Sequence, residues 1–123
     1  MKLAIDALRK RFEKYISFDT QSDEEKEDTY PSTPGQLVFA QALAEELKEI
    51  GLVDVDIDAN GYIMATLPAN GCENTPTIGF IAHLDTSPDT PGGPVHPRVV
   101  SNYDGSNIVL NETQGIVLSP KDF

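Results

Sequence analysis

Residues 77 to 89 decide how the chain is interpreted, and they run Thr77-Ile78-Gly79-Phe80-Ile81-Ala82-His83-Leu84-Asp85-Thr86-Ser87-Pro88-Asp89. The apolar run over 77–83 has the length of one buried strand, and it stops at a histidine. Side chains two positions apart on an extended chain point to the same side, so His83 and Asp85 can converge where the strand leaves the core. This pattern indicates a metal-binding imidazole whose second ring nitrogen is held by a carboxylate.

The same residues also have a plainer interpretation. A histidine at a strand end can simply form a hydrogen bond with a nearby aspartate, and short motifs often match by chance. His96, the second histidine of the sequence, lies between prolines, which favours an exposed loop over a metal site. Ser87 lacks the G-x-S-x-G frame of a serine hydrolase nucleophile.

The composition is typical of one globular domain and excludes several kinds of partner. The chain has 123 residues, of which 39% are hydrophobic and 24% are charged. A net charge of −11 argues against binding to nucleic acids or to anionic membranes. The N-terminus has no apolar signal segment and Cys72 is the single cysteine, so we expect a cytoplasmic protein without an internal disulfide.

The order of the elements predicts an α/β fold with two helices followed by a mixed β-sheet that contains a β-hairpin. The expected helices cover about 2–18 and 34–50, the expected strands about 53–58, 62–67 and 77–83, and short β segments lie between 98 and 118. Thr33 and Gln36 have the spacing of a capping box, and Gly51 suits a C-terminal cap. Asn60-Gly61 predicts a two-residue hairpin turn, and the acidic segment 19–32 predicts a solvated loop.

The motif around His83 resembles the first metal-ligand motif of the M20 family of zinc exopeptidases, in the form found in tripeptide aminopeptidases. Three other segments are similar to the family at corresponding positions: 33–36, the hairpin 60–68, and 117–120. The resemblance therefore covers nearly the whole chain.

This resemblance implies a ligand role for His83 at one of two zinc ions, with Asp85 as the catalytic-site carboxylate that orients it. Enzymes of the family release the N-terminal residue of a peptide, here a tripeptide, with a metal-activated water and a glutamate as general base. The remaining ligands of the family would follow Phe123. We therefore expect the N-terminal part of a catalytic domain, with an incomplete site, no activity by itself, and a tendency to self-associate.

Two other functions stay open. In the first, His83 and Asp85 form a structural pair in a non-catalytic α/β binding or assembly module. In the second, the chain belongs to another M20-type enzyme, a deacylase or a dipeptidase. The continuation Thr86-Ser87-Pro88-Asp89 favours the tripeptide aminopeptidase.

Overall fold

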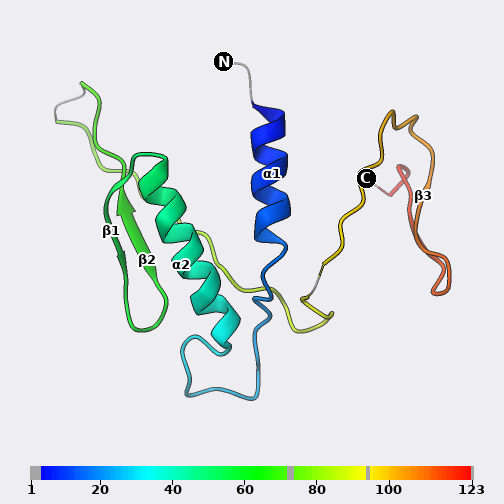
Figure 1. Ribbon diagram of the computed structural model, residues 1–123, viewed down its shortest axis with the longest axis horizontal. Helices are drawn as coiled ribbons and strands as arrows, with labels where there is room; N and C mark the ends of the chain where they lie inside the picture. Colours follow the sequence, from blue (N-terminus) through cyan, green and yellow to red (C-terminus); the bar gives the residue numbers. More distant parts are fainter. Residues whose placement is uncertain (1–3, 72–73, 94, 123) are drawn as a thin grey trace.

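The computed structural model describes residues 4–71, 74–93 and 95–122, and it contains two helices followed by four strands (Figure 1). The elements are α1 (Ile5–Tyr15), α2 (Pro34–Glu49), β1 (Val53–Ile57), β2 (Ile63–Thr66), β3 (Ile108–Asn111) and β4 (Ile116–Leu118). α2 lies along the β1–β2 hairpin, whereas the β3–β4 hairpin stands apart from the other elements. The predicted α/β class is confirmed. In the part of the chain that the structure describes, neither helix is long and apolar enough to cross a membrane.

The carboxylate of Glu46 on α2 holds the C-terminal end of α1. Glu46 Oε1 accepts a hydrogen bond of 3.0 Å from the Tyr15 hydroxyl, and its Oε2 lies 3.1 Å from Lys14 Nζ. Arg11 forms a second ion pair with this side chain, which is only 11% exposed. The Tyr15 ring also packs edge-on against Phe39, with 5.3 Å between the ring centroids. Since no residue of α1 itself is buried, these contacts carry most of its attachment to α2.

The contacts between α1 and Glu46 shift the pKa of two groups, the Glu46 carboxyl and the Tyr15 hydroxyl. Burial acts to raise the pKa of Glu46, but hydrogen bonds from Lys14, Tyr15 and Arg11 outweigh burial and bring that pKa below its ordinary value of 4.5. Burial raises the pKa of Tyr15 above its ordinary value of 10.0, and the neighbouring Glu46 carboxylate adds to this shift. The charged form of Glu46 and the neutral form of Tyr15 are therefore the forms that the fold favours.

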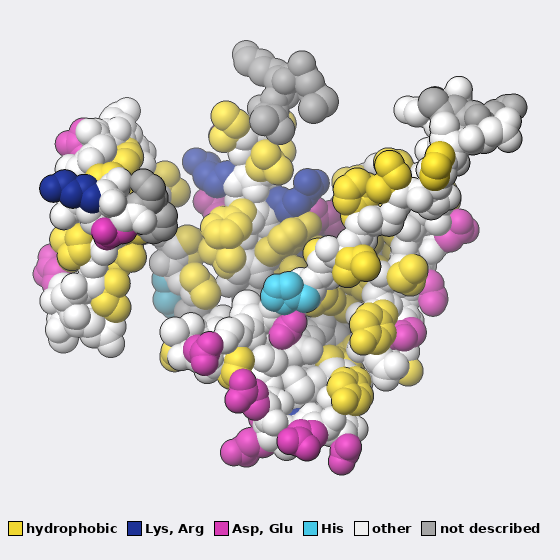
Figure 2. Space-filling model, turned by 180° about the vertical axis from the view of Figure 1, so that it is seen from behind, with side chains coloured by type: hydrophobic (Ala, Val, Ile, Leu, Met, Phe, Trp, Pro, Cys, Tyr) yellow, Lys and Arg dark blue, Asp and Glu magenta, His cyan; other side chains and the backbone are white. Residues whose placement is uncertain are grey.

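The hydrophobic core is small for a chain of this length. Among the described residues, the buried apolar side chains are those of Phe39, Ala40 and Ala44, and all three belong to α2. The chain has 10459 Å² of accessible surface, whereas a compact protein of 13.4 kDa has about 6500 Å². Hydrophobic side chains are spread over the visible face of the molecule (Figure 2). About 4000 Å² more surface is thus exposed than a self-contained domain of this mass would leave.

The two ends of α2 differ in how well the sequence predicted them. The capping box is not formed, because the Thr33 hydroxyl donates to the carbonyl oxygen of Gln21 and Gln36 Nε2 donates to Ser32 Oγ. Both side chains thus hold the preceding loop instead of the first turn of the helix. At the other end, Gly51 has a φ of +96°, so the predicted glycine cap is confirmed.

The β1–β2 hairpin closes with a wider turn than the predicted two-residue turn. The strands are antiparallel, with Ile57 opposite Ile63. Gly61 donates its N–H to the carbonyl of Asp58 at 3.1 Å, and Asp58 donates to the carbonyl of Tyr62 at 3.0 Å. Gly61 has a φ of +83°. This arrangement is a three-residue loop with a glycine bulge, which the side chain of Asp58 favours by accepting bonds from Asn60 and Tyr62.

The predicted buried strand over 77–83 is not formed. Within the described ranges this segment is extended but joins no sheet, and the side chains of Phe80 and Ile81 are 95% and 101% exposed. A strand needs hydrogen-bonding partners for its backbone and a face to bury. Each described hairpin pairs only within itself, so two antiparallel hairpins replace the expected mixed sheet.

Other element boundaries also differ from the prediction. α1 ends at Tyr15 and not near residue 18, because Ser17 Oγ donates to the carbonyl of Lys14 and competes for the last turn. Residues 2 and 3 of the predicted helix, and Cys72, lie outside the described residues. Between 98 and 118 only β3 and β4 are strands, and the predicted β segment near 98–103 is absent from this described range.

Candidate metal-ligand site

His83 and Asp85 lie together at the end of the extended segment. The distance from His83 Nδ1 to Asp85 Oδ1 is 3.0 Å, which is a hydrogen bond. The imidazole is 82% exposed, and the carboxylate is 43% exposed. Because Nδ1 faces the carboxylate, Nε2 is the ring nitrogen left to meet solvent or a metal ion. The structure thus brings the two residues together in the geometry that their spacing suggested.

The chain directly after Asp85 is held by the connection between α1 and α2. Thr86 donates its N–H to the carbonyl of Thr20 at 3.2 Å and accepts one from Ser22 N–H at 3.0 Å. These bonds form a parallel bridge between Gln21 and Thr86. The backbone next to the His83–Asp85 pair is therefore fixed although the segment before it is not part of a sheet.

The side chain of Gln21 completes this attachment. Gln21 Nε2 donates to the carbonyl oxygens of Pro88 and Thr90, both at 3.1 Å, and Gln21 Oε1 accepts from Gly92 N–H at 3.2 Å. A Cβ atom on Gly92 would lie 2.8 Å from Gln21 Cβ, so only glycine fits here without a shift. We call the Gln21 side chain and its bonds to residues 88–92 the glutamine clamp. No sequence signal marked Gln21, since one glutamine in a polar loop has no distinguishing pattern.

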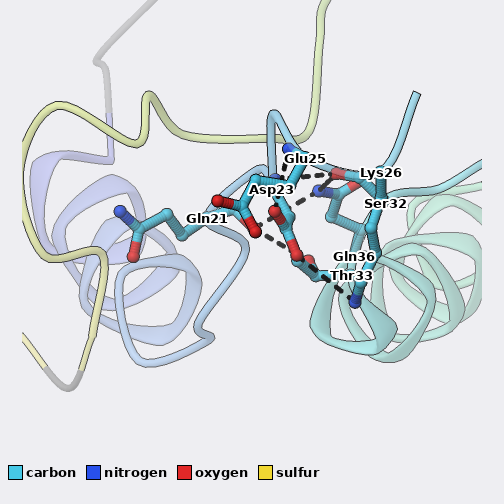
Figure 3. A network of polar contacts seen from close by, with 7 residues as sticks. All are labelled: Gln21, Asp23, Glu25, Lys26, Ser32, Thr33 and Gln36. Carbon is cyan, nitrogen blue, oxygen red and sulfur yellow. Dashed lines mark hydrogen bonds and ion pairs between the residues drawn. The ribbon is translucent and has the colours of Figure 1, made fainter.

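The acidic segment before α2 supports the glutamine clamp from the other side (Figure 3). The carbonyl of Gln21 accepts a bond of 2.8 Å from Thr33 Oγ1, and Asp23 N–H donates to Ser32 Oγ at 3.0 Å. A Cβ atom on Gly35 would overlap the carbonyl oxygen of Asp19, so this loop packs tightly on the first turn of α2. The segment predicted as a solvated loop is therefore ordered by hydrogen bonds at its two ends.

The other candidate residues do not join the site. His96 is exposed, as its proline neighbours predicted. Ser87 Oγ donates to Asp89 Oδ2 at 2.7 Å, which is a contact within one turn. An open hollow of about 620 Å³ beside the clamp has an acidic rim that includes Asp19 and Asp23, and His83 does not line it.

The described residues offer one oriented imidazole and not a complete metal centre. Among them, no group of three or more His, Cys, Asp or Glu side chains could hold a metal ion. Zinc sites in proteins use three or four protein ligands. His83 with Asp85 therefore fits one coordination position, and the described part of the chain does not supply the others.

Comparison with known proteins gives closely similar sequences over nearly the whole chain. The chain is 61% identical over 113 residues to peptidase T from Geobacillus sp. (strain WCH70), an alignment that covers 92% of this chain and 27% of the relative. It is 60% identical over 119 residues to peptidase T from Clostridium acetobutylicum and 55% identical over 119 residues to peptidase T from Clostridium novyi, each covering 97% of this chain and 29% of the relative. No family model matches the chain.

By their names, these relatives belong to one class of protein, the peptidases, and the chain is similar to part of such a protein. More narrowly, the chain is similar to the N-terminal portion of peptidase T. It spans a little over a quarter of the length of the relatives that it matches.

Proposed function

We propose that this chain contributes the metal ligand His83 to the active site of a zinc-dependent tripeptide aminopeptidase of the M20 type. In the complete enzyme, the reaction would release the N-terminal residue of a tripeptide. The similarity of nearly the whole chain to part of peptidase T supports this activity. The single cysteine supports a reducing, cytoplasmic location as part of the same proposal.

One observation carries the proposed role of His83, namely its 3.0 Å contact with Asp85. A carboxylate that accepts the Nδ1–H of a histidine fixes the neutral tautomer and turns Nε2 outward as a metal ligand. A zinc ion bound there would supply Lewis-acid chemistry and activate a water. Asp85 would act by positioning the imidazole, and not by touching the substrate.

The chain alone is proposed to be inactive. One imidazole cannot hold zinc tightly, and the described residues provide no cluster that could complete its coordination. The missing ligands and the general base would have to come from other residues of a longer polypeptide. The glutamine clamp would then serve to hold the backbone after Asp85 in place within that larger site.

The experiment that tests this proposal is a chimera in which this chain replaces the matching segment of the Geobacillus peptidase T. We expect the chimera to hydrolyse tripeptides, because 61% of the exchanged residues are identical. His83→Ala should lower kcat/KM by about a hundredfold or more, and Asp85→Ala by about 10- to 100-fold. His96→Ala is the matched control, since it removes the other exposed histidine.

The isolated chain provides the second half of the test. Calorimetry should show only weak zinc binding that depends on His83, and a tripeptide assay should show no turnover. Turnover by the isolated chain would refute the proposed inactivity. A chimera that keeps full activity after His83→Ala would refute the proposed ligand.

A second candidate function, a non-catalytic binding or assembly unit, is favoured by the excess of exposed surface. Specific dimers bury about 1200 to 2000 Å² in total, which is less than the roughly 4000 Å² of surplus surface. Exposed apolar side chains on α1 (Ile5, Phe12) and on the 77–83 segment (Phe80, Ile81) could supply such a contact. Sedimentation velocity over a range of concentrations should then detect self-association. A monomer at every concentration, with a sharp cooperative melt, would exclude it.

A further inference from the structure

The chain contains two asparagine-glycine pairs, Asn60-Gly61 and Asn70-Gly71, and this dipeptide is prone to deamidation. The backbone nitrogen of the glycine can attack the side-chain amide carbon of the asparagine. Glycine permits this approach because it has no side chain to obstruct the ring that forms. Both asparagines are exposed, so accessibility does not distinguish the two pairs.

The hairpin holds the first pair in a form that resists this reaction. The attacking atom, Gly61 N, donates its hydrogen to the carbonyl of Asp58 at 3.1 Å. Asn60 N donates to Asp58 Oδ1 at 2.9 Å, and this bond fixes the backbone of Asn60 itself. Gly61 also packs closely, since a Cβ atom there would lie 3.2 Å from Leu37 Cδ2. The reaction at Asn60 thus requires the turn to open first.

The second pair has none of these restraints. Asn70 and Gly71 follow the end of β2 in an irregular loop, and both are exposed. Within the part of the chain that the structure describes, neither Asn70 nor Gly71 forms a hydrogen bond through its backbone or side chain. A Cβ atom on Gly71 would meet nothing within 4 Å. The backbone at Gly71 is therefore free to sample the conformations that bring its nitrogen to the Asn70 side chain.

We propose that Asn70 is a site of spontaneous deamidation in this protein, and that Asn60 is protected by its turn. In the step, Gly71 N bonds to Asn70 Cγ, the bond from Cγ to the side-chain nitrogen breaks, and ammonia leaves with the proton from Gly71 N. Water then opens the resulting succinimide at either carbonyl. The products are aspartate and isoaspartate at position 70.

The modification changes both charge and chain path in a loop that leads toward His83. Each event adds one negative charge to a chain whose net charge is already −11. The isoaspartate product also routes the main chain through the side-chain carbon and lengthens the loop by one methylene. The chemistry uses only this chain and water, so it does not depend on the proposed peptidase activity.

Peptide mapping by mass spectrometry after incubation at mildly alkaline pH tests the proposal. We expect residue 70 to deamidate at least about fivefold faster than residue 60, the factor that one protecting hydrogen bond provides. The same incubation in concentrated urea should bring the two rates together. Urea removes the structural difference, and both pairs stand in the same local sequence, Ala-Asn-Gly.

A variant separates protection from intrinsic reactivity. Asp58→Ala removes the carboxylate that fixes Asn60 and should raise the rate at residue 60 while leaving residue 70 unchanged. Equal rates at 60 and 70 in the native chain, or faster reaction at 60, would overturn the proposal. A difference that persists in urea would also overturn it, since structure would then not be its cause.

Discussion

The hydroxyl of Tyr15 donates a hydrogen bond of 3.0 Å to Glu46 Oε1, across 31 positions of sequence. Arg11, one turn of α1 before Tyr15, and the adjacent Lys14 contact the same carboxylate. One side chain of α2 thus satisfies three polar groups of α1. The attachment of the first helix depends on this carboxylate more than on buried apolar area.

Replacement of that carboxylate should loosen the helix. We expect Glu46→Gln to lower the free energy of unfolding by about 1 to 3 kcal/mol, because it removes the charge that the three donors share. Urea unfolding followed by circular dichroism measures the change. Glu45→Gln is the matched control, since Glu45 is exposed and its ion pair with Lys48 lies on the helix surface. Equal losses in the two variants would contradict this role of Glu46.

Acid should weaken the same contact. The folded-state pKa of Glu46 lies below its ordinary value of 4.5, so the unfolded chain binds the proton more readily. The stability that Glu46 contributes is therefore complete above pH 4.5 and is lost as the pH falls through the lower, folded-state pKa. Urea midpoints of the wild type and Glu46→Gln should converge in acid. A constant gap between them at all pH values would refute the prediction.

High pH should also weaken the contact between α1 and Glu46, because Tyr15 then loses the proton that it donates. Here the folded-state pKa lies above the ordinary 10.0, so the folded chain holds the proton more tightly. This contribution is present at neutral pH and is lost as the pH rises through the raised pKa. The difference between the tyrosine absorbance titrations of the wild type and of Tyr15→Phe isolates Tyr15. This difference should appear at a higher pH than the titration of the other tyrosines. Coincident titrations would show that neither burial nor the Glu46 carboxylate raises the pKa of Tyr15.

Gly35 should tolerate no side chain. A methyl group there would overlap the carbonyl oxygen of Asp19, so Gly35→Ala must displace the loop from α2, and we expect a loss of about 1 to 3 kcal/mol. Gly79→Ala is the control, because a Cβ atom at Gly79 would meet nothing within 4 Å. Urea unfolding compares the two variants. A loss at Gly79 as large as at Gly35 would mean that steric overlap is not the cause.

Removal of the glutamine clamp should free the residues after Asp85. Gln21→Ala deletes the bonds to Pro88, Thr90 and Gly92, and we expect amide hydrogen exchange over residues 86–92 to become about tenfold faster. Gln41→Ala, at an exposed position of α2, is the control. Unchanged exchange in Gln21→Ala would show that the backbone bonds of Thr86 hold this segment without help.

Local signals predicted the elements whose stability is local. The helix over 34–49 and the two strands after it follow from apolar periodicity and from Gly51, and every end agrees with the prediction to within one residue. The pairing of His83 with Asp85 is local as well, because two positions on an extended chain suffice for it.

Features that depend on distant partners could not be predicted in this way. An apolar run such as 77–83 becomes a strand only if another strand pairs with it, and none of the described strands does. The glutamine clamp joins residues 67 to 71 positions apart, and no periodic pattern relates them. The capping box failed for the same reason, since a remote carbonyl competes for the Thr33 hydroxyl.

The clamp also has a consequence for the order of folding. Its bond between Gln21 and Pro88 closes a loop of 67 residues, and closure of such a loop costs about 4 kcal/mol in chain entropy. Each hydrogen bond returns only about 1 kcal/mol, so no single bond can form the clamp. The bonds must form together, after α2 and its hairpin have brought the two segments near each other. The residues around His83 would then be the last part of the chain to take their places, and the first to be lost when folding is incomplete.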